Sequence, residues 1–151
     1  MSDPTVIEGV FPNLHRTSYK VMSPYDQRYN CVAWAIGDDT TWWWPGPPMG
    51  KSWWPHWAPA GITVDSFVRF FRGMRFELCS DGSPEEGFEK VAIYAIGSRP
   101  THVARQLAPG RWTSKLGKSF DIEHVIEALE GDEYGSVACY LKRRRPSGPL
   151  S

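Results

Sequence analysis

A cysteine stands at the position where the sequence predicts that a helix begins. In the stretch YNCVAWAIG, Asn30 is a favourable N-cap residue, an apolar run follows Cys31, and Gly37 can end the helix. The free backbone N–H groups and the dipole of a helix start favour negative charge, so we expect a lowered thiol pKa and a nucleophilic sulfur at Cys31. The alternative is a structural cysteine, because buried cysteines commonly pack as small apolar side chains.

A nucleophilic cysteine of this kind needs a histidine as its general base. His102 lies at the start of the β-rich run THVARQLA and follows the apolar run VAIYAI, which places it at the mouth of a buried sheet. From there an imidazole can take the thiol proton and later return it to a leaving group. The alternative is a histidine whose hydrogen bonds are satisfied by its strand neighbours.

The elements that must position these two residues form an α+β pattern. Apolar residues at helical spacing predict a second helix from Ile62 or Thr63 to Gly73, with Thr63 as its N-cap. Asp121 can cap a third helix in DIEHVIEALEG. Strands are predicted in the runs RFELCS, EKVAIYAIG, THVARQLA, GRWTSKLG and YGSVACYLKR, with a hairpin turn at LAPGRW. We therefore expect an N-terminal helix carrying Cys31 packed on an antiparallel β-sheet.

The chain is predicted to form a single domain over residues 1–151. Residues 1–28 are expected to be an extended arm with at most one short strand. The prolines and glycines of residues 38–61 predict a long loop without regular structure. Residues 142–151 contain four consecutive basic side chains and are expected to form a solvated, frayed tail.

The loop at residues 38–61 carries six of the eight tryptophans. A buried indole N–H needs a partner, so some of these rings are expected to line a groove beside the nucleophile. The candidates for holding a sugar ring, a peptide or another protein are Trp43, Trp44, Trp54 and Trp57. The alternative is a lid whose rings pack on one another and cover the sheet.

Charge and cysteine content argue against several classes of protein. The 17 basic and 17 acidic side chains cancel, so no nucleic-acid or membrane partner is expected. Three widely spaced cysteines without a CxxC pair argue against a disulfide framework and a zinc site, and no cofactor or metal is expected. Because the sequence shows no signal peptide or membrane span, we expect a cytoplasmic location, although export without a cleavable signal would leave the same sequence.

A cysteine at a helix start is followed here by KVAIYAIGSRPTHVARQLAPGRW, which supplies a strand, a turn, a histidine-bearing strand, a hairpin and a further strand. Over residues 28–116 this order resembles the papain-like hydrolases of the NlpC type and the cysteine, histidine-dependent amidohydrolases and peptidases. The segments NCVAWAIGD, WWWP, ARQLAPGRWTSKLG, DIEH and YGSV also resemble a group of small bacterial proteins, which implies relatives but no reaction.

The resemblance implies a third catalytic position on the strand after the histidine, where a polar residue orients the imidazole. This position falls on Ser114, whose hydroxyl can fix a tautomer but cannot stabilise an imidazolium by charge. Asp121 and His124 are the alternatives, and outside this role they are expected to be a helix cap and a half-exposed helix residue. Lys115 either binds an anionic group or is a solvated lysine.

The same resemblance implies that the oxyanion is met by the backbone N–H of Cys31 and by a side chain upstream, either Gln27 or Asn30. The leading hypothesis is a cysteine hydrolase or amidase that cleaves amide or peptide bonds in cell-wall peptide or a target protein, in the manner of a bacterial effector or toxin. The second hypothesis is a non-catalytic module that binds a protein, peptide or glycan through its tryptophan-rich loop, with Cys31 in the core.

Overall fold

The fold combines short helices with one large antiparallel sheet, which confirms the predicted α+β class. The computed structural model describes residues 11, 19–23, 30–36, 42–44, 52–55, 57, 61–106, 111–116 and 121–145. Over these ranges the helices are α2 (Cys31–Ala35), α3 (Val64–Gly73) and the 3₁₀ helix η2 (Ile126–Leu129).

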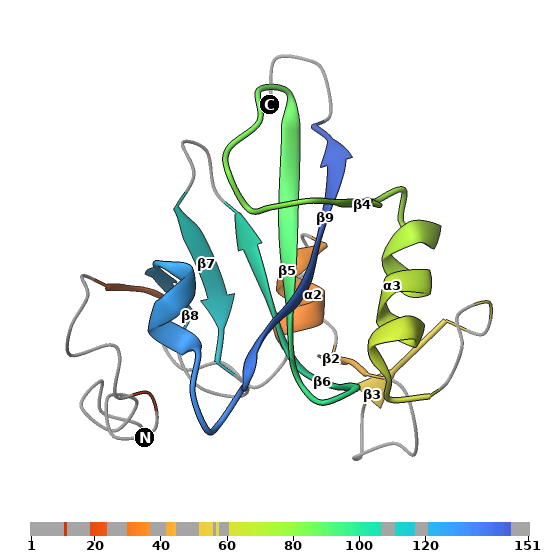
Figure 1. Cartoon of the computed structure of the whole chain (residues 1–151), viewed down its shortest axis with the longest axis horizontal. Coiled ribbons are helices and arrows are strands. Elements are labelled where there is room, and N and C mark those ends of the chain that lie inside the picture. Colours follow the sequence, from red (N-terminus) through yellow and green to blue (C-terminus); the bar gives the residue numbers. More distant parts are fainter. Residues whose placement is uncertain are drawn as a thin grey trace.

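One seven-stranded sheet forms the centre of the described chain. Its strands are β1 (Lys20–Ser23), β4 (Glu77–Cys79), β5 (Phe88–Ile96), β6 (Arg99–Gln106), β7 (Trp112–Lys115), β8 (Asp121–His124) and β9 (Ser136–Arg144). They lie in the order β1-β8-β7-β6-β5-β9-β4, and each neighbouring pair is antiparallel. Strand β9 therefore enters between β5 and β4, as Figure 1 shows.

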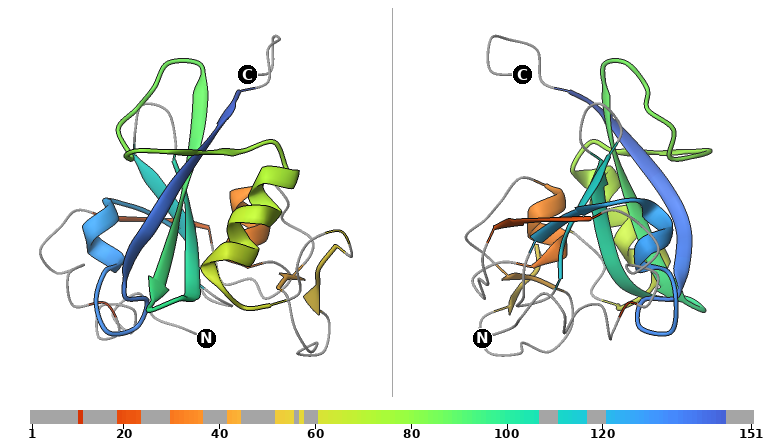
Figure 2. Two further views of the ribbon diagram at one scale, coloured as in Figure 1. Left: turned by 45° about the vertical axis from the view of Figure 1, so that its right-hand side comes forward. Right: turned by 90° about the vertical axis from the view of Figure 1, so that its left-hand side faces the viewer.

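The two faces of the sheet carry separate cores. On one face, α2 and α3 pack over Val91, Ile93 and Val103, and Cys31 belongs to this first cluster. On the other face, η2 contributes to a second cluster that contains Tyr94. Successive side chains of a strand point to opposite faces, so neighbours such as Ile93 and Tyr94 fall into different cores. The two views of Figure 2 show how α2, α3 and η2 are arranged around the strands.

Two of the three predicted helix starts are confirmed. The side chain of Asn30 accepts a hydrogen bond from the backbone N–H of Ala33, and that of Thr63 accepts one from Ser66. At the other end of α3, Arg75 adopts a left-handed backbone conformation with φ of 75°. This conformation ends the helix.

The third predicted helix is wrong. Asp121–His124 form strand β8, which pairs with β7 on one side and β1 on the other, and only Ile126–Leu129 turn into the short helix η2. The apolar spacing that predicted the helix is divided between a strand and a turn of 3₁₀ helix. Pairing on both edges of β8 and burial of Ile122 outweigh the local helical pattern.

The predicted solvated tail is also wrong for its first residues. Strand β9 continues to Arg144, and Lys142 and Arg143 donate hydrogen bonds to the carboxylates of Glu85 and Glu89. The guanidinium of Arg143 also lies over the ring of Phe76, 4.4 Å from its centroid. Basic side chains of β9 therefore join it to the neighbouring strand β5 and to the connection that contains Glu85, while residues 146–151 lie outside the described part.

The remaining strand predictions can be compared in the same way. The four runs between residues 75 and 116 correspond to β4, β5, β6 and β7, and the last predicted strand corresponds to β9. One short strand in the arm, β1, is described. The hairpin turn at residues 107–110 lies outside the described residues. The tryptophan-rich loop is not wholly irregular, because β2 (Trp42–Trp43) and β3 (Ser52–Trp53) form a short parallel pair.

Candidate active site

Cys31 is the first residue of α2 and is buried, with 6% of its surface exposed. Backbone groups of Val103 and Val32 hydrogen-bond to its sulfur and lower the thiol pKa, and the nearby Lys115 does the same by charge. Burial outweighs them and raises the pKa from 9.0 to about 11. The expected lowering of this pKa is therefore wrong, since the helix start stabilises the thiolate less than loss of water destabilises it.

His102 lies in β6 and is 1% exposed. Its ring stacks on Tyr134, with centroids 4.3 Å apart and planes 5° apart, and also contacts Tyr94. Neither ring nitrogen has a hydrogen-bond partner among the residues that the structure describes. Burial, with a smaller effect from His124, holds the pKa of His102 well below its ordinary value, so the imidazole is neutral. Strand neighbours surround this ring without satisfying its nitrogens.

The Cys31 sulfur lies against the residue of β6 that follows His102, but the sulfur and the His102 ring lie on different faces of the sheet. The sulfur meets the backbone of Val103 in the first cluster, whereas His102, the preceding residue, points its ring at Tyr94 and Tyr134, which belong to the second. No hydrogen bond joins Cys31 to His102 among the described residues. Burial raises the pKa of the Tyr134 hydroxyl, and Cys31 adds to this effect by charge, so Tyr134 stacks on His102 and lies within electrostatic reach of Cys31.

Ser114 and His124, proposed as alternative orienting residues, instead pair with each other. The Oγ atom of Ser114 lies 2.7 Å from Nε2 of His124, and Nδ1 of that ring lies 2.7 Å from the carbonyl oxygen of Val125. A carbonyl can only accept, so Nδ1 carries the proton and Nε2 accepts from the serine hydroxyl. Burial lowers the pKa of His124 from 6.5 to about 4, which keeps this arrangement neutral.

Three expectations about the surroundings of this pair need correction. His124 is a fully buried strand residue rather than a half-exposed helix residue. Asp121 starts β8, opposite Lys115 of β7, and therefore caps no helix, while its side chain lies outside the described part. Lys115 is fully buried rather than solvated. Sequence reasoning assigned it to solvent because a lysine is rarely buried.

The proposed oxyanion side chains differ in what the structure shows of them. Asn30 is 2% exposed and uses its Oδ1 atom to cap α2, so its amide is held at the helix start. Gln27 lies outside the described residues. The backbone N–H of Cys31 is at the beginning of the same helix.

The described rings of the tryptophan-rich loop pack on α3. Trp44 and Trp54 are partly buried against the cluster that contains Cys31, and both contact Phe67. Trp57 is 51% exposed and lies parallel to Phe70, with centroids 6.0 Å apart. These contacts correspond to the lid alternative, although the lid covers a helix rather than the sheet. The backbone of Trp43 lies in β2, and its side chain is outside the described part.

Two general features of the described chain bear on its chemistry. Its residues include no group of three or more histidine, cysteine, aspartate or glutamate side chains placed to hold a metal ion. None of the helices that these residues form has the length and apolar character to cross a bilayer. Sequence reasoning missed Tyr134, which touches His102 through a contact between distant segments that no local spacing indicates.

An α+β protein with a cysteine at the start of a helix, packed on a sheet strand that carries a buried histidine, is the class that fold and site define. The chain belongs to the family described as a domain of unknown function (DUF7689), whose family model matches residues 20–142. No match was found among curated proteins or among solved structures. The matched span runs from β1 into β9 and contains every described residue of the candidate site.

Proposed function

We propose that this protein is a papain-like thiol hydrolase of amide or peptide bonds, with Cys31 as nucleophile and His102 as general base and acid. One observation carries the proposal. Cys31 begins an N-capped helix and its sulfur lies against the backbone of Val103, and the preceding residue, His102, carries a buried imidazole with no hydrogen-bond partner among the described residues, on the other face of the sheet. A buried polar group left unpaired costs free energy, and such groups are retained where chemistry needs them.

The resting site holds a thiol and a neutral imidazole, because burial raises the pKa of Cys31 and lowers that of His102. Catalysis then begins with transfer of the thiol proton to a ring nitrogen of His102 as the sulfur attacks the carbonyl carbon. The imidazolium returns this proton to the departing amine, leaving a thioester. Water, deprotonated by the same imidazole, cleaves the thioester and restores the thiol.

His102 and the Cys31 sulfur lie on opposite faces of the sheet, so proton transfer requires a local rearrangement of β6 that brings the ring to the face of the sulfur. Hydrogen bonds of catalytic groups commonly tighten only when substrate is bound. The backbone N–H of Cys31 is the donor offered to the oxyanion, since Asn30 fixes the start of the helix. Ser114 and His124 are engaged with each other and support the strand arrangement around His102 rather than orienting its ring.

Acyl transfer from an activated ester tests the proposal without knowledge of the substrate. Incubation with p-nitrophenyl acetate should place one acetyl group on Cys31, found by peptide mass spectrometry, and Cys31→Ala should abolish it. His102→Phe keeps an aromatic ring against Tyr134 and should slow acetylation by about a hundredfold or more. Cys79→Ala is the thiol control and should change nothing. Acetylation of Cys31 at an equal rate in His102→Phe would refute the pairing.

A second candidate function rests on the exposure of Trp57. This ring lies flat on Phe70, with half of its surface in solvent, which suits stacking on a sugar or an aromatic side chain. In a binding module, Trp57→Ala should remove binding on peptide and glycan arrays and leave the fold intact. In a hydrolase without that function, the variant should bind and acetylate as the parent protein does.

A further inference from the structure

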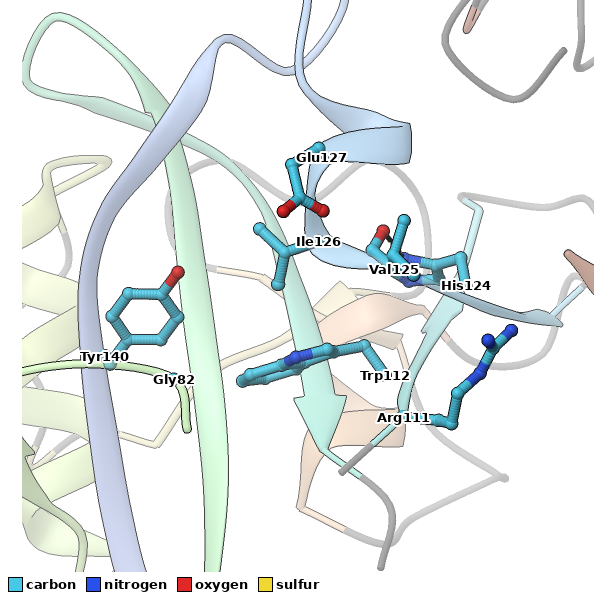
Figure 3. Close-up of a pocket in the computed structure, with 8 residues that line it drawn as sticks. All are labelled: Gly82, Arg111, Trp112, His124, Val125, Ile126, Glu127 and Tyr140. Carbon is cyan, nitrogen blue, oxygen red and sulfur yellow. Dashed lines mark hydrogen bonds between the residues drawn. The ribbon is translucent and has the colours of Figure 1, made fainter. Parts of the chain in front are cut away.

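A pocket of about 340 Å³ opens on the face of the sheet opposite to Cys31, between β7, β9 and η2. Figure 3 shows the indole of Trp112 across its floor, Tyr140 on one side, and Val125 and Ile126 on the other. This volume falls in the range of small-molecule sites. The pocket belongs to the second core face and shares no residue with the Cys31 and His102 pair.

The connection between β4 and β5 forms one wall of the pocket at Gly82. The carbonyl of Gly82 accepts a hydrogen bond of 2.6 Å from the side chain of Gln106 in β6. A Cβ at Gly82 would lie 2.6 Å from the ring of Tyr140 and 3.0 Å from that of Trp112, so any larger residue would displace these rings. The buried side chain of Gln106 therefore holds the backbone of Gly82 close to the rings of Tyr140 and Trp112.

Carboxylates lie around the Tyr140 end of the pocket. In Figure 3 the carboxylate of Glu127 and the hydroxyl of Tyr140 face the same space above Trp112. Glu130 and Asp81 also lie within electrostatic reach, and after burial these carboxylates are the main cause of the raised pKa of Tyr140. Among the described residues the Tyr140 hydroxyl has no hydrogen-bond partner, so its oxygen can accept from a ligand.

We propose that this pocket binds an organic cation, an alkylammonium or guanidinium group on an apolar stem such as the side chain of lysine or arginine. The cation would donate to Glu127 and Tyr140, and its stem would lie on Trp112 and Ile126, where aromatic faces attract positive charge. An anionic ligand would be repelled by the Glu127 carboxylate. Arg111, at the far end, is held by an ion pair of 3.0 Å with Glu123.

Three probes of equal chain length separate charge from hydrophobic contact: pentylammonium, pentanol and pentanoate. Titration of the ¹⁵N-labelled protein with each, followed by NMR, should show saturable shifts at pocket residues with pentylammonium only. Glu127→Gln should weaken this binding by about fivefold to tenfold, which corresponds to about 1 kcal/mol of ion pairing. Glu77→Gln, on strand β4, removes the same charge elsewhere and should leave the affinity unchanged.

Glu127 is exposed, so its variants are expected to fold as the parent protein does. Tyr140→Phe removes the acceptor oxygen and should weaken pentylammonium alone. Equal binding of pentanol and pentylammonium, shifts outside the pocket, or an unchanged affinity in Glu127→Gln would each overturn the assignment. The result is independent of the acetylation experiment, because Cys31 is not part of this pocket.

Discussion

The hydroxyl of Ser114 is hydrogen-bonded to Nε2 of His124 at 2.7 Å, inside a core where both side chains are fully buried. This pair lies across strands β7 and β8 and joins them by side chains as well as by backbone. The preceding residue of β7, Thr113, has a buried hydroxyl with no hydrogen-bond partner in the described part of the chain. Of these two adjacent buried hydroxyls on β7, that of Ser114 is therefore hydrogen-bonded and that of Thr113 is not.

Removal of the two hydroxyls should have opposite effects on stability. Ser114→Ala leaves Nε2 of His124 without a donor and should lower the free energy of unfolding by about 1–3 kcal/mol. Thr113→Val replaces an unpaired hydroxyl by a methyl group of similar shape and should be neutral or stabilising. Urea denaturation of both variants measures the difference. Equal destabilisation would show that the Ser114 hydrogen bond contributes nothing.

Stability should fall as the solution is made acidic. In the unfolded chain His124 binds a proton near pH 6.5, whereas in the folded protein it does so only near pH 4. Between these values the unfolded state binds more protons, so the free energy of unfolding is full above pH 6.5 and falls as the pH decreases toward 4. His102, whose pKa is also lowered, adds to this loss.

The expected loss is about 1.4 kcal/mol per pH unit for each of the two histidines. Urea denaturation at a series of pH values measures the slope. His102→Phe removes one of the titrating groups and should reduce the slope by about half. The same variant should be as stable as the parent protein at neutral pH, since the nitrogens that it removes have no partners. A slope that does not change in this variant would contradict the burial of a neutral His102.

The Cys31 thiol should react slowly in the folded protein. Burial raises its pKa to about 11, so little thiolate is present at neutral pH. Iodoacetamide should label the half-buried Cys79 sooner than Cys31, and labelling of Cys31 should rise steeply only in alkaline solution or on unfolding. Peptide mass spectrometry of timed samples measures both rates. Rapid labelling of Cys31 below neutral pH would mean that the resting site holds a thiolate.

The end of α3 can be stabilised by one substitution. Arg75 holds a left-handed backbone conformation, φ of 75°, that glycine adopts without steric cost. Arg75→Gly should raise the free energy of unfolding by about 1 kcal/mol. Arg72→Gly removes the same charge inside the last turn of the helix, where glycine is unfavourable, and should lower it by about as much. Thermal denaturation distinguishes these outcomes, and a decrease in both variants would contradict the first expectation.

Local chemistry explains which parts of the fold could be predicted. Asn30 and Thr63 act as N-caps because their side chains reach backbone N–H groups within one turn, and this information lies within a few residues. Strand β5 follows from a continuous apolar run and β6 from a β-rich run bounded by turn residues. The placement of Cys31 at a helix start was predicted for the same local reason.

The errors arise where partners distant in sequence decide the outcome. Residues 121–131 have helical spacing, yet Asp121–His124 form a strand because they pair with β7 on one side and with β1 on the other. The pKa of Cys31 depends on how deeply the whole sheet covers α2, and the pairing of Ser114 with His124 depends on strand register. The stacking of Tyr134 on His102 joins segments more than thirty residues apart in the printed sequence.

The position of β9 imposes an order on assembly during synthesis. Among the described strands, β4 pairs with β9 alone, and β9 occupies the edge of β5 that would otherwise remain open. All the other described strands leave the ribosome before β9 does. Until then β5 presents an unpaired, apolar edge, which is the kind of surface that recruits other chains. Before residues 136–144 emerge, this open edge of β5 is available for aggregation and for binding by chaperones.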